Sequence, residues 1–323
     1  MKSLRKKAIR FALICVAAGL LIGFVALAAL DFNFFEVGTM EPVTSVHEPT
    51  EAFAGIMVRA ASSDVRLLPA EDGRCSVVCD ETDRVSHTVT VEGGTLVIRS
   101  VDHSRWYERI GFVWNMSLMK VTIYLPERAY DDLYIQTASG DVDVPGDFSF
   151  TQAEVDGSSG AIRFAAPVEG ELLLKSVSGS IQVSTVAPEA LTVTSTSGSV
   201  TVEAVEVGEA FSCKTVSGDQ RINRVTCQNA SIYSTSGSVI ASDLVASEHI
   251  DMEAVSGSLK LERCDADTLW LKTVSGDVTG TLRTEKAFLA STVSGSVRVP
   301  DTAAGGVCEV KTVSGSIQLD VLE

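Results

Sequence analysis

Two short runs of alternating apolar and polar residues recur from about residue 132 to the end of the chain. Between the two runs lies Ser-Gly, whose glycine recurs at intervals of 19 or 20 residues, at Gly140, Gly160, Gly179, Gly198, Gly218, Gly237, Gly257, Gly276, Gly295 and Gly315. The positions five before, two after and four after each glycine are apolar, with Gln220 and Gly280 as exceptions. Because alternation at every second position is typical of a strand, each copy is predicted to form two short strands joined at a Ser-Gly corner.

A unit of this length cannot bury the inner face of its two strands alone. Stacking of similar units solves the problem, because each strand then pairs with its counterparts above and below. The sequence therefore predicts an all-β protein, a parallel β-solenoid of about ten coils over residues 132–323. The position three before the glycine is mostly Thr or Ser, otherwise Ala or Gly. Such residues suit a tight inward corner, and their hydroxyl groups could form a ladder along the solenoid axis.

Residues 50–131 lack this period and are predicted to form an N-terminal β cap of antiparallel strands. Strand patterns cover 55–69, 75–81, 87–100 and 119–126, and Glu-Gly-Gly supplies a hairpin turn. "ASSDV" at 61–65 resembles a degenerate corner, so the cap is expected to continue the solenoid and to cover its first edge.

At the other end of the solenoid no cap is visible in the sequence. The last predicted strand lies only a few residues before Glu323. Either the charges of Asp320 and Glu323 protect this edge, or another subunit or partner covers it, and end-to-end self-association is one such arrangement.

A membrane anchor is predicted at the N-terminus. Residues 1–10 carry five basic side chains, and residues 11–30 carry no charge over a length that spans a bilayer as a helix. The basic residues place the N-terminus in the cytoplasm, and a linker at 31–49 leads to the exported part. The protein is therefore expected in the cell membrane, with a single span and an extracellular C-terminal domain. A cleaved signal peptide ending near residues 26–28 is the alternative.

The part beyond residue 30 is strongly acidic. It carries 42 acidic and 21 basic residues, because five of the 26 basic residues precede it, so its formal charge is −21. Such a charge disfavours binding to nucleic acid or to anionic headgroups. Divalent cations and cationic peptides are better electrostatic partners.

The strand patterns "GGTLVIRS" at 93–100 and "KVTIYLP" at 120–126, together with the anchor and the Ser-Gly copies, resemble the bacterial putative-adhesin family. This family is also described as LiaG-like or as a β-strand-repeat domain of unknown function. The resemblance covers about residues 50–323. It implies an exported, envelope-associated protein without assigned catalysis, some relatives lying beside envelope-stress signalling systems. The chain departs from the family in its six exported cysteines and in the degenerate copy at 157–164.

The cysteines and histidines do not predict a metal or cofactor site. Beyond Cys15 in the anchor, the cysteines are Cys75, Cys79, Cys213, Cys227, Cys264 and Cys308. Cys213, Cys264 and Cys308 fall in apolar columns and are expected to be small core residues. Cys75 and Cys79, four apart on a strand, lie about 13 Å from each other, too far for a mutual disulfide. Other pairings in the cap stay open. The histidines, at 47, 87, 103 and 249, are scattered.

Catalysis is not predicted, although one pair of carboxylates requires inspection. Asp141 and Asp143 lie roughly 6.6 Å apart on one strand face, within the range for glycoside hydrolysis. Their place beside a turn favours a charged surface instead. No histidine recurs near the Ser-Gly serines, and their context is not that of a nucleophilic serine.

Aromatic residues supply the candidate partner-binding positions. Trp106, Tyr107, Phe112 and Trp114 lie within nine residues of an aromatic-poor chain. They either plug the end of the solenoid or form a surface for a peptide, a glycan or a lipid interface. Trp270 falls in an outward column, flanked on the neighbouring predicted coils by Asp251 and Leu289.

These features favour a non-enzymatic, membrane-anchored envelope protein. The first hypothesis is a scaffold or sensor that presents an acidic solenoid surface to an envelope protein. The alternative is an adhesin that binds a cell-surface glycan or a foreign surface. A polysaccharide-cleaving enzyme is a third, weaker hypothesis that rests on Asp141 and Asp143.

Overall fold

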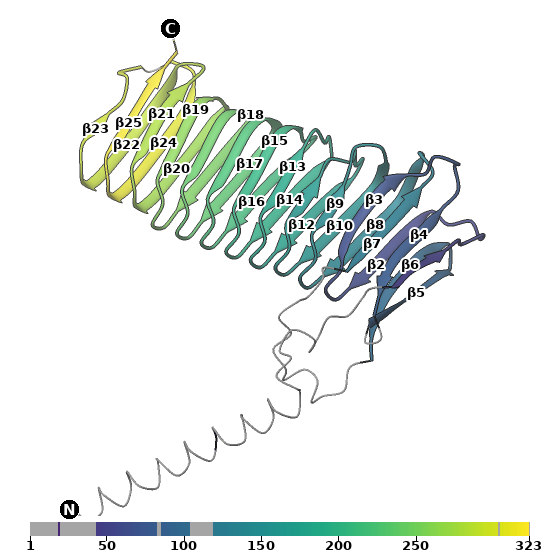
Figure 1. Cartoon of the computed structure of the whole chain (residues 1–323). Helices are drawn as coiled ribbons and strands as arrows, with labels where there is room; N and C mark the ends of the chain where they lie inside the picture. Colours follow the sequence, from purple (N-terminus) through teal and green to yellow (C-terminus); the bar gives the residue numbers. More distant parts are fainter. Residues whose placement is uncertain (1–18, 20–42, 83–84, 104–118, 303, 323) are drawn as a thin grey trace, which may run out of the picture. The chain divides into compact units, whose positions relative to one another are not determined.

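The described part of the chain from residue 43 onward is built from β-strands joined in one continuous sheet that winds into a solenoid (Figure 1). The computed structural model describes residues 19, 43–82, 85–103, 119–302 and 304–322. Strands of successive coils pair in parallel, so the predicted parallel β-solenoid is confirmed. The predicted anchor at 11–30 lies outside the described residues, apart from Gly19. The described residues contain no helix that is long and apolar enough to cross a membrane.

From β8 (Ala129–Thr137) onward, the strands follow the two arms of the coils in turn. In chain order the described strands are β1 (Val43–His47), β2 (Gly55–Ala60), β3 (Asp64–Pro69), β4 (Ser76–Glu81), β5 (Val85–Glu92), β6 (Thr95–Asp102), β7 (Lys120–Leu125), β8 (Ala129–Thr137), β9 (Val142–Val144), β10 (Ser149–Gly157), β11 (Ile162–Phe164), β12 (Glu171–Ser176), β13 (Ile181–Ser184), β14 (Ala190–Ser195), β15 (Val200–Glu206), β16 (Ala210–Thr215), β17 (Gln220–Ser234), β18 (Val239–Ala254), β19 (Leu259–Cys264), β20 (Thr268–Ser275), β21 (Val278–Leu282), β22 (Lys286–Ser294), β23 (Val297–Arg298), β24 (Gly306–Ser314) and β25 (Ile317–Val321). The long strands β17 and β18 each contain the second arm of one coil and the first arm of the next.

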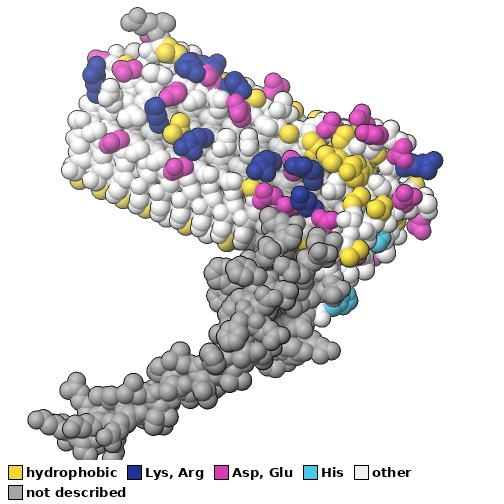
Figure 2. Space-filling model, viewed as in Figure 1, with side chains coloured by type: hydrophobic (Ala, Val, Ile, Leu, Met, Phe, Trp, Pro, Cys, Tyr) yellow, Lys and Arg dark blue, Asp and Glu magenta, His cyan; other side chains and the backbone are white. Residues whose placement is uncertain are grey.

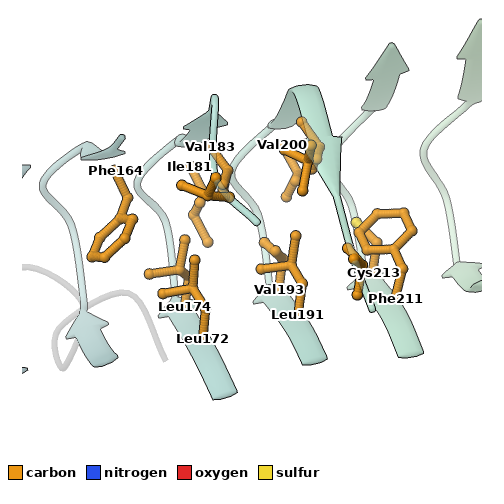
Figure 3. Close-up of a cluster of buried hydrophobic side chains, with 14 of the residues drawn as sticks. Phe164, Leu172, Leu174, Ile181, Val183, Leu191, Val193, Val200, Phe211 and Cys213 are labelled. Atoms are coloured by element: carbon orange, nitrogen blue, oxygen red, sulfur yellow. The ribbon is translucent and has the colours of Figure 1, made fainter. Parts of the chain in front are cut away.

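The core lies between the two arms and continues from coil to coil. Equivalent repeat positions are aligned, so Val155 lies beside Ile135 in one direction and Leu174 in the other. Apolar side chains of β12 and β14 face those of β13 and β15 in the interior (Figure 3). The exception in the apolar column, Gln220, is also buried, and its Nε2 donates to Thr215 Oγ1 (2.8 Å) and to the Tyr233 carbonyl (2.6 Å).

The Ser-Gly corners stack with their backbones in direct contact. A Cβ atom added to Gly198 would lie 1.9 Å from the carbonyl oxygen of Gly179, a distance that no side chain can occupy. Within the corner, the buried Ser195 Oγ accepts the Gly198 N–H at 3.0 Å. The hydroxyl groups thus bond chiefly to corner backbone, and the predicted ladder between hydroxyls is represented by one contact, Thr215 to Ser234 at 3.4 Å. Glycine is required here because the neighbouring coil occupies the space of a side chain.

The residue after the glycine links neighbouring coils when it is Asp. Asp141 Oδ1 accepts the N–H of Ala161 (2.8 Å), and Asp219 Oδ1 accepts the N–H of Ser238 (3.0 Å). Asp277 accepts the N–H of Ser316 at 2.7 Å, across 39 residues of sequence. The acidic corner residues therefore have a structural role that satisfies backbone donors between layers.

A left-handed turn follows the second arm in several coils. The residues six after the glycine have φ between 53° and 60° although they are not glycine: Thr185, Ala204, Arg224, Asp243 and Arg263. Asp243 holds the guanidinium groups of Arg263 and Arg283 on two further coils. These arginines keep the Asp243 pKa low, at about 2, so the carboxylate stays ionised at neutral pH.

The last two coils are stacked in the reverse of their chain order. β24 pairs with β20 on one side and with β22 on the other, and β25 lies likewise between β21 and β23. The corner contacts follow the same order, since Gly315 lies against Gly276 and Gly295 lies against Gly315. β22 and β23 therefore form the outermost coil (Figure 1), and the expectation that the C-terminal strand lies at the end of the stack is wrong.

The first coils show a related interleaving. β2 pairs in parallel with both β6 and β8, and β3 pairs in parallel with both β7 and β9. Antiparallel pairing, expected for all of residues 50–131, is found for β5 with β6, β4 with β7 and β1 with β4. Ser63 takes the place of a corner glycine, since its carbonyl oxygen lies 1.8 Å from a Cβ built on Gly140. "ASSDV" is thus a true corner.

The corner contact predicts a large effect of one methyl group. Gly198→Ala should lower the free energy of unfolding by about 3 kcal/mol, because the coils must separate to admit the Cβ atom. Gly208→Ala is the matched control, since its nearest atom, Glu189 Cα, is 3.4 Å from the added Cβ. The control should change stability by less than about 1 kcal/mol. Urea unfolding of both variants measures the difference, and equal effects would contradict the corner contact.

Candidate functional site

Trp270 lies on the outward face of β20, between residues of two other coils. The strand pairing places it beside Asp251 of β18 and Glu309 of β24. The neighbour expected from chain order, Leu289, is one coil further away, because β24 is inserted before β22. The indole is 44% exposed and stacks on the His249 imidazole, with ring centroids 5.4 Å apart and an interplanar angle of 14°. This contact holds one face of the ring and fixes its orientation.

A shallow groove of about 280 Å³ surrounds this tryptophan. Its lining comes from three coils and comprises Asp251, Glu253, Trp270, Leu271, Lys272, Glu309 and Lys311. Lys272 forms an ion pair with Glu253 at 3.1 Å, and Lys311 forms one with Glu309. Burial raises the pKa of Asp251, and the nearby Glu253 adds to this effect while Lys272 opposes it. The groove therefore combines an oriented aromatic ring with carboxylate acceptors and ammonium donors.

This combination is suited to a polar ligand with an apolar face. A sugar ring can lay its C–H face on an indole while its hydroxyl groups donate to carboxylates and accept from ammonium groups. A small number of polar groups around an apolar surface is the usual pattern of a ligand site. The volume suits one or two sugar rings rather than a long buried chain.

The other predicted aromatic positions lie outside the described residues. These are Trp106, Tyr107, Phe112 and Trp114, all within the segment 104–118. Trp270 is therefore the member of the predicted set around which a site can be built.

The acidic pair considered for catalysis is engaged in structural contacts. Arg163 lies 3.6 Å from Asp141, and Arg66 donates to Asp143 at 3.0 Å. Asp141 also accepts the backbone N–H of Ala161. Both carboxylates thus join neighbouring coils, an arrangement that favours a structural role over glycoside hydrolysis.

A second polar cluster, missed by the sequence analysis, lies at the corner of the first coil. The Ser63 hydroxyl is 3.3 Å from His87 Nε2, and His87 Nδ1 is 3.6 Å from Glu81 Oε1. The order resembles a serine hydrolase triad, but Ser63 is fully buried, so a substrate cannot reach its hydroxyl in this conformation. Burial lowers the His87 pKa below 6.5, although Glu81 and Asp80 act in the opposite direction. Ser63 directly precedes β3, Glu81 ends β4 and His87 lies in β5, and these described strands are not paired with one another. The folding of the cap brings the three residues together, and no sequence spacing indicates it.

The cysteines of the described chain are all free and buried: Cys75, Cys79, Cys213, Cys227, Cys264 and Cys308. Burial raises the pKa of the Cys213 thiol to about 12 and that of Cys75 to about 11. Such thiols are poor nucleophiles at neutral pH. Within the described ranges no group of three or more His, Cys, Asp and Glu side chains is placed to hold a metal ion.

An apolar edge runs along the Ser-Gly corners. The residue two before the glycine points outward, and in several coils it is an exposed valine: Val177, Val216, Val274, Val313 and Val293. Figure 2 shows hydrophobic side chains at regular intervals along the lower edge of the solenoid. The Val-Ser-Gly phrase therefore exposes an apolar side chain at each of these corners.

The fold and groove define a repeat protein, a parallel β-solenoid with a shallow ligand-sized groove on one face. The chain belongs to the Toastrack DUF4097 family, whose model matches residues 53–210 and 207–323. This assignment confirms the resemblance to a β-strand-repeat family of unknown function. No curated protein sequence matches the chain.

Several solved structures are similar to the chain. A protein of Parabacteroides distasonis described as a putative lipid binding protein is 17% identical over 88% of this chain and 98% of its own, with a TM-score of 0.51. Putative adhesins of Parabacteroides merdae (13% identity, TM-score 0.49) and Bacteroides fragilis (14%, 0.44) match 88% and 87% of this chain, and 98% and 97% of their own. The similarity to the first of these shows a shared fold.

The buried imidazole of His87 predicts that the stability of the N-terminal cap decreases in acid. The folded state holds His87 neutral, whereas the unfolded state takes up a proton below about pH 6.5. Stability should therefore fall as the pH drops through this value, and the loss should level off below the lowered folded pKa. His87→Gln, which can still bond to Ser63, should show a smaller loss between neutral and mildly acidic pH. Thermal unfolding measured for both proteins across this range tests the effect, and parallel curves would contradict it.

Proposed function

We propose that the protein is a non-enzymatic, membrane-anchored surface protein of the adhesin-like kind that binds a glycan in the groove around Trp270. The observation that carries this proposal is the exposed indole of Trp270. The ring stacks on the imidazole of His249, and Trp270 lies between Asp251 and Glu309 of the neighbouring strands. An aromatic platform beside paired donors and acceptors matches the chemistry of a sugar ring.

Other observations support a role in binding rather than in catalysis. Asp141 and Asp143 are engaged with arginines, and Ser63 is fully buried. The putative-adhesin description of two similar structures is in keeping with a surface role. The uncharged stretch at 11–30 supports an anchor that displays the solenoid outside the cell.

A scaffold or sensor for an envelope protein is the second candidate. The exposed valine edge along the Ser-Gly corners favours it, since a row of apolar side chains offers a contact surface longer than the Trp270 groove. In this case the partner would be a protein, and loss of the indole would leave the interaction unchanged.

Binding to defined carbohydrate distinguishes the two functions. The full-length protein in detergent should bind purified cell-wall sacculi or arrayed neutral oligosaccharides, and Trp270→Ala should weaken binding by about tenfold or more, ~1.4 kcal/mol. Tyr233→Ala is the matched control, because Tyr233 is also an exposed aromatic residue on the same arm but does not line the groove. Equal binding by wild type and Trp270→Ala, or no binding of any carbohydrate, would refute the glycan site.

A further inference from the structure

The outermost coil at the C-terminal end of the solenoid has a free strand edge. Among the described strands, β22 pairs only with β24, and β23 pairs only with β25. The outer side of β22 therefore presents backbone donors and acceptors without a neighbouring strand. Leu289 and Val293 of this strand are 62% and 83% exposed.

The core is incompletely covered at this end. The inward positions of β22, Phe288, Ala290 and Thr292, are half-buried. Their counterparts one coil further in, Cys308, Val310 and Thr312, are buried. An additional layer on β22 would therefore bury apolar surface as well as satisfy the backbone edge.

The edge lacks the features that normally prevent strand pairing. Charged side chains, proline and bulges protect natural edges. From Ala287 to Ser294 there is no charged residue and no proline, and the register with β24 runs without a shift. The carbonyl of Ser294 accepts the N–H of Gly315, so the backbone N–H and C=O groups of Ser294 point toward β24. Since the direction alternates along a strand, Leu289 and Ser291 direct their N–H and C=O groups outward.

The edge is also held in place. The Lys286 ammonium group, at the start of β22, is buried and lies 2.8 Å from Asp265. Thr302 Oγ1 donates to the Lys286 carbonyl at 2.6 Å. At the start of β24, the strand inserted between β20 and β22, Gly305 and Gly306 lie directly against the backbone of Glu285 and Asp267. A fixed edge is ordered before binding, which lowers the entropic cost of pairing.

We propose that β22 pairs with β22 of a second copy of this chain, in antiparallel orientation, and forms a two-fold symmetric dimer of solenoids joined at their C-terminal ends. In a two-fold contact the β22 edge of each copy pairs with the β22 edge of the other, so neither of these edges is left for a third copy.

The sequence of β22 suits this pairing. Full overlap of the strand with itself centres the register on Ala290, so that Leu289 pairs with Ser291 of the other copy. These are the residues whose backbone groups point outward. Rotation about an axis normal to the sheet keeps Phe288, Ala290 and Thr292 on the inner side in both copies. The two cores then become continuous across the contact.

A second copy fits this edge better than a charged partner. The segment Ala287–Ser294 offers no charge for an electrostatic partner to recognise, whereas the exported part as a whole carries −21. That charge makes two copies repel at a distance, and salt screens the repulsion. Dimerisation should therefore strengthen as ionic strength rises.

The oligomeric state of the full-length protein in detergent tests the proposal. Sedimentation over a concentration series up to about 100 µM should show a monomer–dimer equilibrium that salt shifts toward the dimer. Leu289→Pro, which removes an outward N–H, should weaken the dimer at least tenfold. Leu289→Thr keeps the N–H and should leave most of the dimer. Dimers unaffected by Leu289→Pro, a monomer at all concentrations, or open-ended polymers would each overturn the proposal.

A cysteine crosslink provides a test that does not depend on folding of the proline variant. Ala290→Cys should form an intermolecular disulfide under mild oxidation, because directly opposed residues of this type lie about 4.5 Å apart at Cα. Val307→Cys is the control, exposed on β24 but one strand away from the edge. Crosslinking of Ala290→Cys alone supports the contact. Equal crosslinking of both, or of neither, contradicts it.

Discussion

The close contact between stacked Ser-Gly corners is the constraint on which the rest of this structure depends. The carbonyl oxygen of one corner glycine fills the space of a Cβ atom on the next, as Gly179 does for Gly198. This contact fixes the position of each coil on the one below, and the buried hydroxyl three residues earlier fixes the corner itself. Parallel pairing of both arms and a continuous core follow from it, because equivalent residues are then held in register.

The same constraint explains how a surface site arises from a repeat. Register between coils brings one outward residue from each of three strands into a row, Asp251, Trp270 and Glu309. Substitution at outward positions leaves the corners and the core unchanged, so one face can change its chemistry without loss of the fold. The Trp270 groove is a local variation of this kind, and the uncharged edge of β22 is another.

Much of this fold could be predicted from the sequence, because alternation of period two and a recurring glycine are local signals. The order of the last coils could not, since every copy carries the same corner and any corner can stack on any other. Trp270 was consequently assigned Leu289 as a neighbour, whereas Glu309 lies there. The sequence signal for this order was the Gly305-Gly306 pair, which allows the start of β24 to lie directly against the backbone of Glu285 and Asp267. The cluster of Ser63, His87 and Glu81 is formed by three segments of the cap that come together only in the folded chain, which no spacing in the sequence reveals.

The most direct test of the account is a crosslinking measurement of the order in which the last coils stack, which either follows the corner contacts or follows the order of the chain. Lys272→Cys with Lys311→Cys places two cysteines directly opposite each other on adjacent strands, whose spacing is about 4.8 Å, whereas Lys272→Cys with Ser291→Cys places them two layers apart. The native thiols of the described residues are buried, with pKa values raised to between about 11 and about 12, so they give little background. The account predicts that oxidation crosslinks the first pair and leaves the second pair free. Crosslinking of the second pair with the first pair free would show coils stacked in chain order and contradict it.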